Sequence, residues 1–305
     1  MKLKTLIIGL GNQGQKRRRL MGDNYVASVD PINSEAEYRH LVDVPIESFD
    51  AAILCTPDSE KYESLKYLVN NRKHVLVEKP LLISNAQGFK EIEFAAIQKN
   101  VFVCTAYNHR FEPGFRQIKK YLEEYMLGNL YSIRCFYGNG TARLNRNSAW
   151  RDRGSGVIDD LGSHLLDTIA FWLQGQQPTN YSLISANTFE NSSPDHAVIA
   201  SLLSIPRIEL EMTLLMWKNT FSCDIIGESG SLHMNGLCKW GPSEIILRKR
   251  KLPSGVPDEI KIAFPSGDPT WELEYTNFKN AILNSQKTDF SNDFLIHDTL
   301  HNLWN

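Results

Sequence analysis

Short apolar segments alternate with amphipathic segments over the first 115 residues. The amphipathic segments Ser59–Asn71 and Ser84–Lys99 have helical periodicity with polar faces. Such alternation predicts a doubly wound parallel sheet with helices on both faces. The segment 33–48 is short for a complete helical crossover. The expected strands are the apolar runs Leu3–Gly9, Tyr25–Asp30, Ala51–Thr56, His74–Val77 and Val101–Thr105.

The pattern changes after residue 115. Arg116–Leu127 and Val157–Leu173 are predicted helices, and Leu130–Gly138 begins a long strand. Several strands with short turns follow between Tyr181 and Arg250, which predicts an open, mainly antiparallel sheet. A late helix is expected over Thr270–Asn284. We therefore expect an α/β chain with a parallel-sheet domain, 1–115, and an α+β domain, 116–305.

A glycine-rich turn lies between the first strand and the helix that follows it. Gly9 permits the tight turn, Gly11 allows backbone to approach a pyrophosphate, and Gly14 lets helix and strand pack closely. The helix N-terminus favours a bound phosphate. Together with the intervening Asn12 and Gln13, the turn predicts a dinucleotide site of the Rossmann type.

Asp30 ends the second strand, about twenty residues after the first glycine, where the pattern places an acceptor for a ribose 2′-hydroxyl. A carboxylate there would repel a 2′-phosphate, and Pro31, Ile32 and Asn33 supply no cation. NAD is therefore favoured over NADP. The four cations 16–19 face different directions on a helix, so most of them are expected to be solvated.

Polar residues follow several of the predicted parallel strands. Ligands of such sheets bind beyond the carboxyl ends of the strands, so these residues should converge on one crevice. Lys79 could hold a substrate oxygen by a charge-assisted hydrogen bond and take part in proton transfer. Taken alone, a surface lysine at a turn is the commoner outcome. The residues that follow the predicted strands are Thr56 and Pro57, Glu78 to Pro80, and Tyr107 and Asn108.

A second candidate group lies on the helix near residue 160. Asp160 and His164 are four residues apart and share a helical face, and Asp167 follows three residues later. A carboxylate beside an imidazole can fix its tautomer and raise its basicity, as a general base for alcohol oxidation requires. An acidic helix N-terminus with a structural histidine would give the same pattern.

Two further segments combine a cation with aromatic residues. Arg110 lies in 107–111, and Arg151 lies in 148–152 beside Trp150. Either arginine could bind an anionic part of a substrate, but interdomain packing or ion pairs would look the same.

Composition narrows the class of protein. The 305 residues carry a net charge of −2 and are 42% hydrophobic, which argues against a nucleic-acid binder or a polybasic membrane anchor. No apolar run is long enough for a transmembrane helix. Five widely spaced cysteines without a C-x-x-C pair indicate reduced thiols in a cytoplasmic protein. The eight histidines have no metal-ligand spacing, so no metal is expected.

These motifs together resemble the glucose–fructose oxidoreductase, inositol dehydrogenase and rhizopine catabolism (Gfo/Idh/MocA) family over nearly the whole chain. The resemblance rests on the glycine turn, Thr56-Pro57, Glu78-Lys79-Pro80, 108–111 and 160–164. It implies that Lys79, Asp160 and His164 match catalytic positions. Where the family commonly has a histidine after threonine-proline, this chain has Asp58 to Lys61.

The resemblance implies an NAD(P)-dependent oxidoreductase acting on a secondary alcohol of a sugar, cyclitol or nucleotide-sugar. It looks most like members from bacterial surface-sugar pathways. It also implies a homodimer or homotetramer formed through the second sheet. Two alternatives stay open: a redox-neutral lyase or glycosidase that uses NAD transiently, and a non-catalytic nucleotide-sensing protein.

Overall fold

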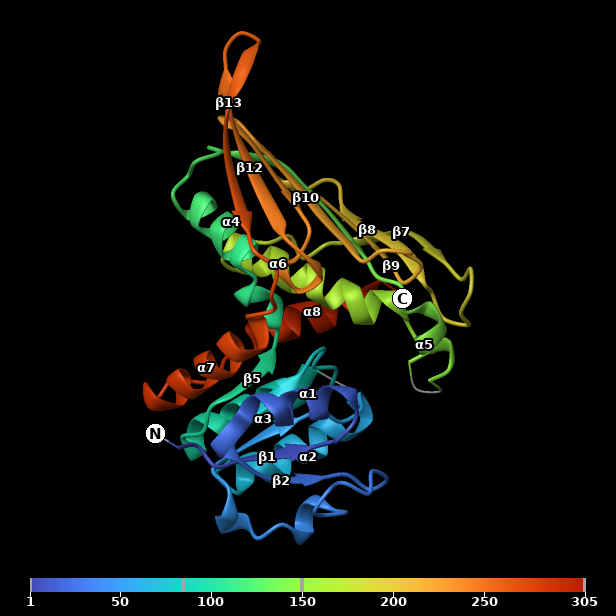
Figure 1. Cartoon of the computed structure of the whole chain (residues 1–305), viewed down its shortest axis with the longest axis vertical. Helices are drawn as coiled ribbons and strands as arrows, with labels where there is room; N and C mark the ends of the chain where they lie inside the picture. The colour runs from blue at the N-terminus through green and yellow to red at the C-terminus, as the bar shows by residue number, and fades with distance from the viewer. Residues whose placement is uncertain (1, 84–85, 149–150, 304–305) are drawn as a thin grey trace. The chain divides into compact units, whose positions relative to one another are not determined.

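The computed structural model describes residues 2–83, 86–148 and 151–303 (Figure 1). The chain forms two compact units, which we describe separately. The first unit contains residues 1–108 and 271–297, and the second contains residues 109–270 and 298–305.

A five-stranded parallel sheet is the centre of the first unit. Its strand order is β2-β1-β3-β4-β5, so the order reverses beside β1, as in doubly wound folds. All four neighbouring pairs are parallel, which confirms the predicted sheet. The strands are β1 (Thr5–Ile8), β2 (Tyr25–Val29), β3 (Ala51–Leu54), β4 (His74–Glu78) and β5 (Val103–Ala106).

Helices cover both faces of this sheet, because most strand residues are apolar and buried. One face packs against α2 (Asp58–Asn70) and α3 (Ala86–Lys99) through side chains such as Leu65 and Phe89. The first residues of the expected helix, Ser84 and Asn85, lie outside the described residues. No helix forms between β2 and β3, where two short 3-10 turns occupy Leu41–Asp43 and Ile46–Ser48.

The other face packs against α1 (Asn12–Met21) and α7 (Thr270–Leu283). Tyr275 and Phe278 of α7 are buried with strand residues, and the Tyr275 hydroxyl lies 2.9 Å from Thr5 Oγ1. We expected this late helix in the second domain, but residues 271–297 belong to the first compact unit. The division into domains at residue 115 stays a prediction.

Arg17 is an exception among the four cations of α1, because it is buried. Its guanidinium donates to Glu78 Oε1 over 2.8 Å and to a carboxylate oxygen of Glu274 on α7, and it lies over the Trp271 ring. These two carboxylates hold the pKa of Arg17 above its usual value, although burial alone would lower it. Arg17 therefore links α1, the end of β4 and α7 by a charged network.

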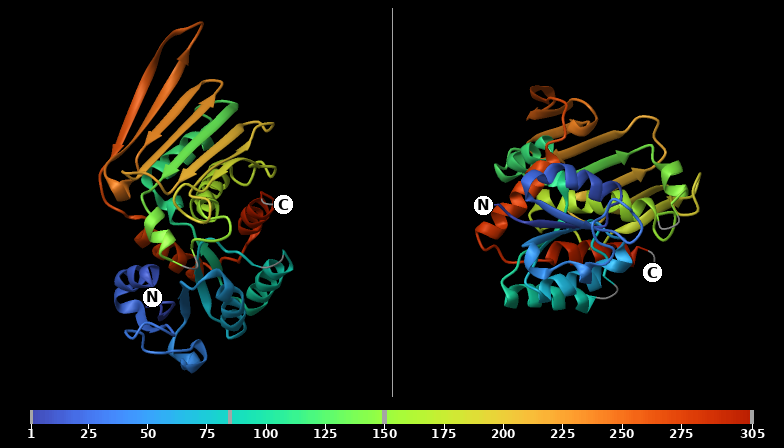
Figure 2. Two further views of the ribbon diagram at one scale, coloured as in Figure 1. Left: turned by 90° about the vertical axis from the view of Figure 1, so that its right-hand side faces the viewer. Right: turned by 60° about the horizontal axis from the view of Figure 1, so that its bottom comes forward.

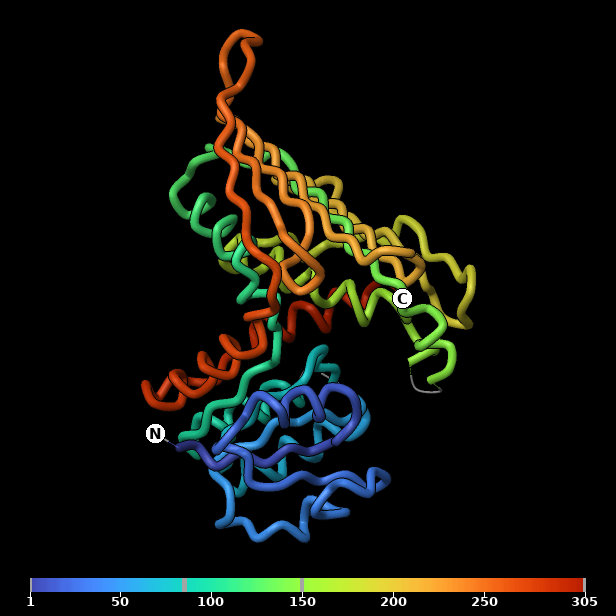
Figure 3. Tube along the Cα trace, in the orientation of Figure 1, coloured from blue at the N-terminus to red at the C-terminus, as the bar shows by residue number. Residues whose placement is uncertain are grey.

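An eight-stranded sheet is the centre of the second unit (Figure 2). Its order is β13-β12-β11-β10-β6-β9-β8-β7, and only the central β6–β9 pair is parallel. The predicted open, mainly antiparallel sheet is confirmed. In Figure 3 the hairpin of β12 and β13 extends past the neighbouring strands. The strands are β6 (Leu130–Gly138), β7 (Ser182–Asn187), β8 (His196–Ser201), β9 (Arg207–Thr213), β10 (Thr220–Gly227), β11 (Gly230–Asn235), β12 (Ser243–Lys251) and β13 (Gly255–Phe264).

Two helices cover one face of this sheet. Phe115 of α4 (Pro113–Glu123) contacts Trp172 of α6 (Ser163–Leu173) and Phe221 of β10, with ring centroids about 5 Å apart in each pair. Alternate strand residues on the other face are polar and carry ion pairs, including Arg134–Glu209 and Arg248–Glu259. A short helix, α5 (Ala142–Arg146), was not expected, and α8 (Ser291–Asn302) is divided between the two units.

No helix in the described parts of the chain has the length and hydropathy needed to cross a membrane. All five cysteines are free thiols, and the sulfurs of Cys135 and Cys223 lie 3.4 Å apart on neighbouring strands. Within 2–83, 86–148 and 151–303, no three potential ligands are grouped so that they could hold a metal ion.

His74 makes the stability of the first unit dependent on pH. Its Nδ1 accepts a 2.8 Å hydrogen bond from the Phe102 amide, and burial lowers its pKa from 6.5. The unfolded chain therefore takes up this proton first as the pH falls through 6.5. We expect the free energy of unfolding to decrease below that pH by at most about 1.4 kcal/mol per pH unit from this residue.

Urea denaturation of wild type and His74→Asn at pH 7.5 and 5.5 measures this effect, since Asn can accept the same hydrogen bond but does not titrate. The exposed His40 gives a matched control, His40→Asn. If the free energy of unfolding fell equally between pH 7.5 and 5.5 in wild type and in His74→Asn, His74 would not be the source of the pH dependence.

Candidate active site

Close packing positions the glycine turn of the first unit. Gly9 has φ +90°, and a Cβ there would lie 2.6 Å from the Cys55 carbonyl oxygen. A Cβ on Gly14 would lie 1.9 Å from the Gly9 carbonyl oxygen, so α1 approaches β1 only because this residue is glycine. A Cβ on Gly11 would meet no atom within 4 Å. The turn is thus packed on the protein side and open at Gly11, as a backbone cradle for a pyrophosphate requires.

Asp30 holds two loops together beside this turn. Its Oδ2 accepts from the Leu10 amide over 2.7 Å, and its Oδ1 accepts from the Ile32 and Asn33 amides. These bonds lower the pKa of the Asp30 carboxyl, although burial opposes them. A carboxylate offers about four acceptor positions, so Oδ2 keeps one for a ribose hydroxyl. The structural role of Asp30 was not foreseen from the sequence.

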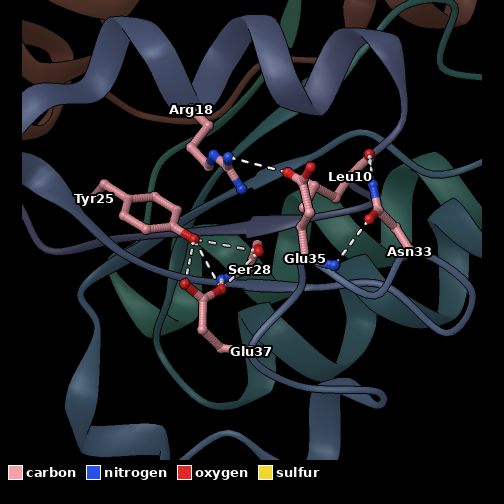
Figure 4. Close-up of polar contacts among 7 residues, drawn as sticks. All are labelled: Leu10, Arg18, Tyr25, Ser28, Asn33, Glu35 and Glu37. Atoms are coloured by element: carbon pink, nitrogen blue, oxygen red, sulfur yellow. Dashed lines mark hydrogen bonds and ion pairs between the residues drawn. The ribbon is translucent and has the colours of Figure 1, made fainter.

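The loop after Asp30 is held by an acidic network (Figure 4). Glu37 accepts from the Tyr25 hydroxyl, the Ser28 hydroxyl and the Ser28 amide. Arg18, the cation drawn there, pairs with Glu35 over 3.2 Å. Arg18 therefore already has a carboxylate partner. The carboxylates of the network add negative charge near Asp30.

Two buried polar atoms near the expected cofactor site have no hydrogen-bond partner among the described residues. They are Gln13 Oε1, on the first turn of α1, and Thr56 Oγ1, after β3. Buried polar atoms are normally paired, so such atoms fit a molecule that supplies the missing bonds. With the open turn at Gly11, they agree with a bound dinucleotide.

Lys79 follows the last residue of β4 and is half-buried. Its neighbour Glu78, which is a predicted cofactor residue, accepts a hydrogen bond from Arg17. On the other side, the carbonyl oxygen of Pro80 accepts a 2.5 Å hydrogen bond from the buried ammonium of Lys61. Lys61 also pairs with Asp58 over 2.6 Å. The segment that departs from the family pattern thus fixes the backbone beside Lys79.

The other strand-end residues lie where the pattern predicts. Pro57 directly precedes α2, and Tyr107 and Asn108 follow β5 in buried positions. Because β3, β4 and β5 are parallel, Thr56, Lys79 and Tyr107 follow the same edge of the sheet.

In the second unit, the segment containing Asp160 is a π-helical turn, Ile158–Gly162, followed directly by α6. Such turns are rare and are often found at functional sites. Asp160 is half-buried, and His164 on the first turn of α6 is 8% exposed. The sequence predicted a plain helix here.

Arg110 forms an ion pair and remains partly exposed. Its guanidinium donates to the buried Asp167 at 2.5 to 3.0 Å. Such an ion pair was one of the alternatives left open by the sequence. Arg151 is half-buried, and Trp150 lies outside the described residues. The neighbouring Asp152 accepts from the Ser192 and Ser193 amides, which lowers the pKa of its carboxyl.

Sequence reasoning missed a cluster around His164. The His109 ring stacks on the His164 ring, with centroids 4.0 Å apart and planes at 17°. Lys239 Nζ lies 3.1 Å from His109 Nε2 and donates to the Tyr137 hydroxyl over 3.0 Å. Burial lowers the pKa of Lys239 to about 8, although the carboxylates of Asp268, Glu112 and Asp160 oppose this shift. No motif in the sequence marks Lys239, which lies 130 residues after His109.

Two family models match this chain. Residues 3–107 match the oxidoreductase family with an NAD-binding Rossmann fold, and residues 115–233 match the GFO/IDH/MocA C-terminal domain. The chain belongs to the Gfo/Idh/MocA family. This confirms the resemblance on which the sequence analysis relied and the NAD-binding class of the first domain.

Individual relatives are distant. The chain is 26% identical over 196 residues to the rhizopine catabolism protein MocA of Rhizobium meliloti, covering 60% of each protein. It is 30% identical over 149 residues to levoglucosan dehydrogenase of Pseudarthrobacter phenanthrenivorans, covering 47% of this chain and 37% of that enzyme. Each match thus spans less than two thirds of the relative's length.

The fold is similar to that of a levoglucosan dehydrogenase solved with NADH and levoglucosan. The TM-score is 0.80 at 18% identity, covering 99% of this chain and 97% of that one. The two chains therefore share the fold of both units.

Two glycine variants separate packing from cofactor binding. Gly14→Ala places a Cβ against the Gly9 carbonyl, so we expect a loss of about 3 kcal/mol or more of stability, or no folded protein. Gly11→Ala has room for its Cβ and an extended backbone, so the loss of stability should be limited to about 1 kcal/mol, the cost of a poorer N-cap.

Gly11→Ala should nevertheless weaken NADH binding about tenfold or more, because the new methyl group occupies the approach of the pyrophosphate. Thermal unfolding and NADH fluorescence titration measure the two quantities. Unchanged NADH affinity in folded Gly11→Ala would contradict the placement of the cofactor.

Proposed function

We propose that this protein is an NAD-dependent oxidoreductase that acts on a secondary alcohol of a sugar, cyclitol or nucleotide-sugar. The observation that carries the proposal is the glycine turn, packed at Gly9 and Gly14 and open at Gly11. The dehydrogenases among its relatives support the reaction class. Lys79 and His164 lie in different compact units, and their meeting beside the substrate is part of the proposal.

Each residue has a distinct task in the oxidative direction. Bound NAD would accept the hydride that leaves the alcohol carbon. His164 accepts the hydroxyl proton, because a neutral imidazole is a base near neutral pH. Lys79 donates a charge-assisted hydrogen bond to the oxygen as negative charge develops on it. Asp160 orients the substrate or His164.

The residues around Asp30 support NAD rather than NADP. Asp30 keeps an acceptor for a ribose hydroxyl, and Glu35 and Glu37 add negative charge on the same loop. Arg39 donates to the carbonyl oxygens of Asp30 and Asn33, so this cation also has partners already. A 2′-phosphate would meet the carboxylates of Asp30, Glu35 and Glu37, which outnumber the neighbouring cations Arg18 and Arg39.

The substrate is proposed to be a small molecule with several hydroxyl groups, bound by Tyr107, Asn108 and Arg151. Arg110 is also proposed to contact the substrate, and it forms an ion pair with Asp167. We also propose a homodimer or homotetramer formed through the second sheet. The free thiols of all five cysteines agree with a cytoplasmic location.

Replacement of Lys79 tests the reaction. Lys79→Ala should lower kcat about a hundredfold or more, since it removes the charge at the reacting oxygen. NADH affinity should stay within about twofold, because the glycine turn is unchanged. The exposed Lys90 gives a matched control, Lys90→Ala, which should keep full turnover. Full turnover of Lys79→Ala with NAD bound would refute the role.

A thermal-shift screen with NAD present identifies the substrate class. Nucleotide sugars, cyclitols and anhydrosugars are the panel, and a true ligand should stabilise the folded protein by about 2.7 kcal/mol at a hundredfold excess over its Kd. Ligands that raise the melting temperature are then tested for reduction of NAD. Product formation without net NAD reduction would favour the lyase alternative, and binding without turnover would favour the sensor.

A further inference from the structure

The ammonium group of Lys239 makes one hydrogen bond to a histidine beside His164. Nζ lies 3.1 Å from His109 Nε2 and 3.0 Å from the Tyr137 hydroxyl, and 4.6 Å from the centre of the Trp240 ring. The rings of His109 and Tyr137 are 5.4 Å apart. Lys239 is therefore enclosed by aromatic rings next to the stacked histidine pair.

The chemistry of this contact decides where His109 carries its proton. A charged lysine is a donor only, so the nitrogen facing it must offer a lone pair. Nε2 of His109 is then unprotonated, and its single proton lies on Nδ1. A second proton on Nε2 would point at a positive charge about 3 Å away, which disfavours the imidazolium form.

The neutral state of His109 also affects His164, because the two rings are stacked. The ring centroids are 4.0 Å apart and the rings are nearly parallel, so two positive charges in the pair would repel each other strongly. With His109 held neutral, only one ring of the pair gains a positive charge. That ring is His164, the residue proposed to receive the hydroxyl proton.

Several charged groups act on this arrangement. Lys239 is influenced by the carboxylates of Asp268, Glu112 and Asp160, which favour its charged form. Glu112 is itself held by the Cys238 amide at 3.0 Å. Asp167, one turn along α6 from His164, is neutralised by Arg110. At pH 7, below the Lys239 pKa of about 8, the charged ammonium is therefore the main form.

We propose that Lys239 is a positioning residue: its hydrogen bond keeps His109 neutral and protonated on Nδ1, so that His164 is the histidine of the pair that takes up the proton. The inference rests on the proposed function for the role of His164. The state of His109 can be tested without cofactor or substrate.

The experiment is a long-range proton–nitrogen NMR spectrum of the full-length protein labelled with 15N-histidine, at pH 5 to 8. The His109 signals are assigned with His109→Gln. At pH 7, wild type should show Nδ1 protonated and Nε2 as an acceptor. A His109 protonated on Nε2, or an imidazolium at pH 7, would overturn the proposal.

Lys239→Met removes the charge but keeps much of the side-chain length. His109 should then take up a proton at higher pH than in wild type, whereas Lys239→Arg, also a donor only, should preserve the wild-type tautomer. The exposed Lys218 supplies the matched control, Lys218→Met, with an unchanged His109 titration. An unchanged titration in folded Lys239→Met would also overturn the proposal.

These outcomes are separate from the proposed reaction. Absence of turnover with the expected His109 tautomer would reject the reaction and leave the effect of Lys239 on His109 established. Turnover with an unaltered His109 in Lys239→Met would reject the inference alone.

Discussion

The buried charge of Arg17 is the interaction on which the first unit depends. A guanidinium removed from water is stable only with carboxylates beside it, and Glu78 and Glu274 supply them from β4 and α7. Removing one partner of such a group typically costs about 3–5 kcal/mol, because a buried charge is left unpaired. The pair therefore fixes α7 on the parallel sheet and holds the backbone next to Lys79.

Local pattern was enough to predict the parallel sheet and the glycine turn. Fully apolar runs such as Ala51–Leu54 have one stable environment, a strand covered on both faces, and Gly14 is required by contacts with Gly9 and Ile7, a few residues earlier in the chain. The successive strands with short turns between Tyr181 and Arg250 likewise indicated an open, mainly antiparallel sheet. These features depend on neighbours close in the sequence.

Contacts between distant segments could not be predicted from the sequence. Arg17 resembled its exposed neighbours until Glu274, 257 residues later, was seen beside it. The sequence left open whether Arg110 binds substrate or forms an ion pair, because nothing in it indicates that Asp167 lies 2.5 Å away. Lys239 was missed for the same reason, since a single lysine before a tryptophan has no distinguishing spacing. The π-helical turn at Ile158–Gly162 was also not predicted from the sequence.

The order of the eight-stranded sheet leaves β13 and β7 as its two edges. An edge strand presents unpaired amides and carbonyls to which another chain can add a strand. β13 carries Asp258, Glu259 and Lys261, and two of these bind cations of β12. A strand approaching this edge would have to accommodate the charged side chains, so growth by strand addition is disfavoured there. The charges of the long hairpin thus protect it from aggregation while leaving the broad face of the sheet accessible.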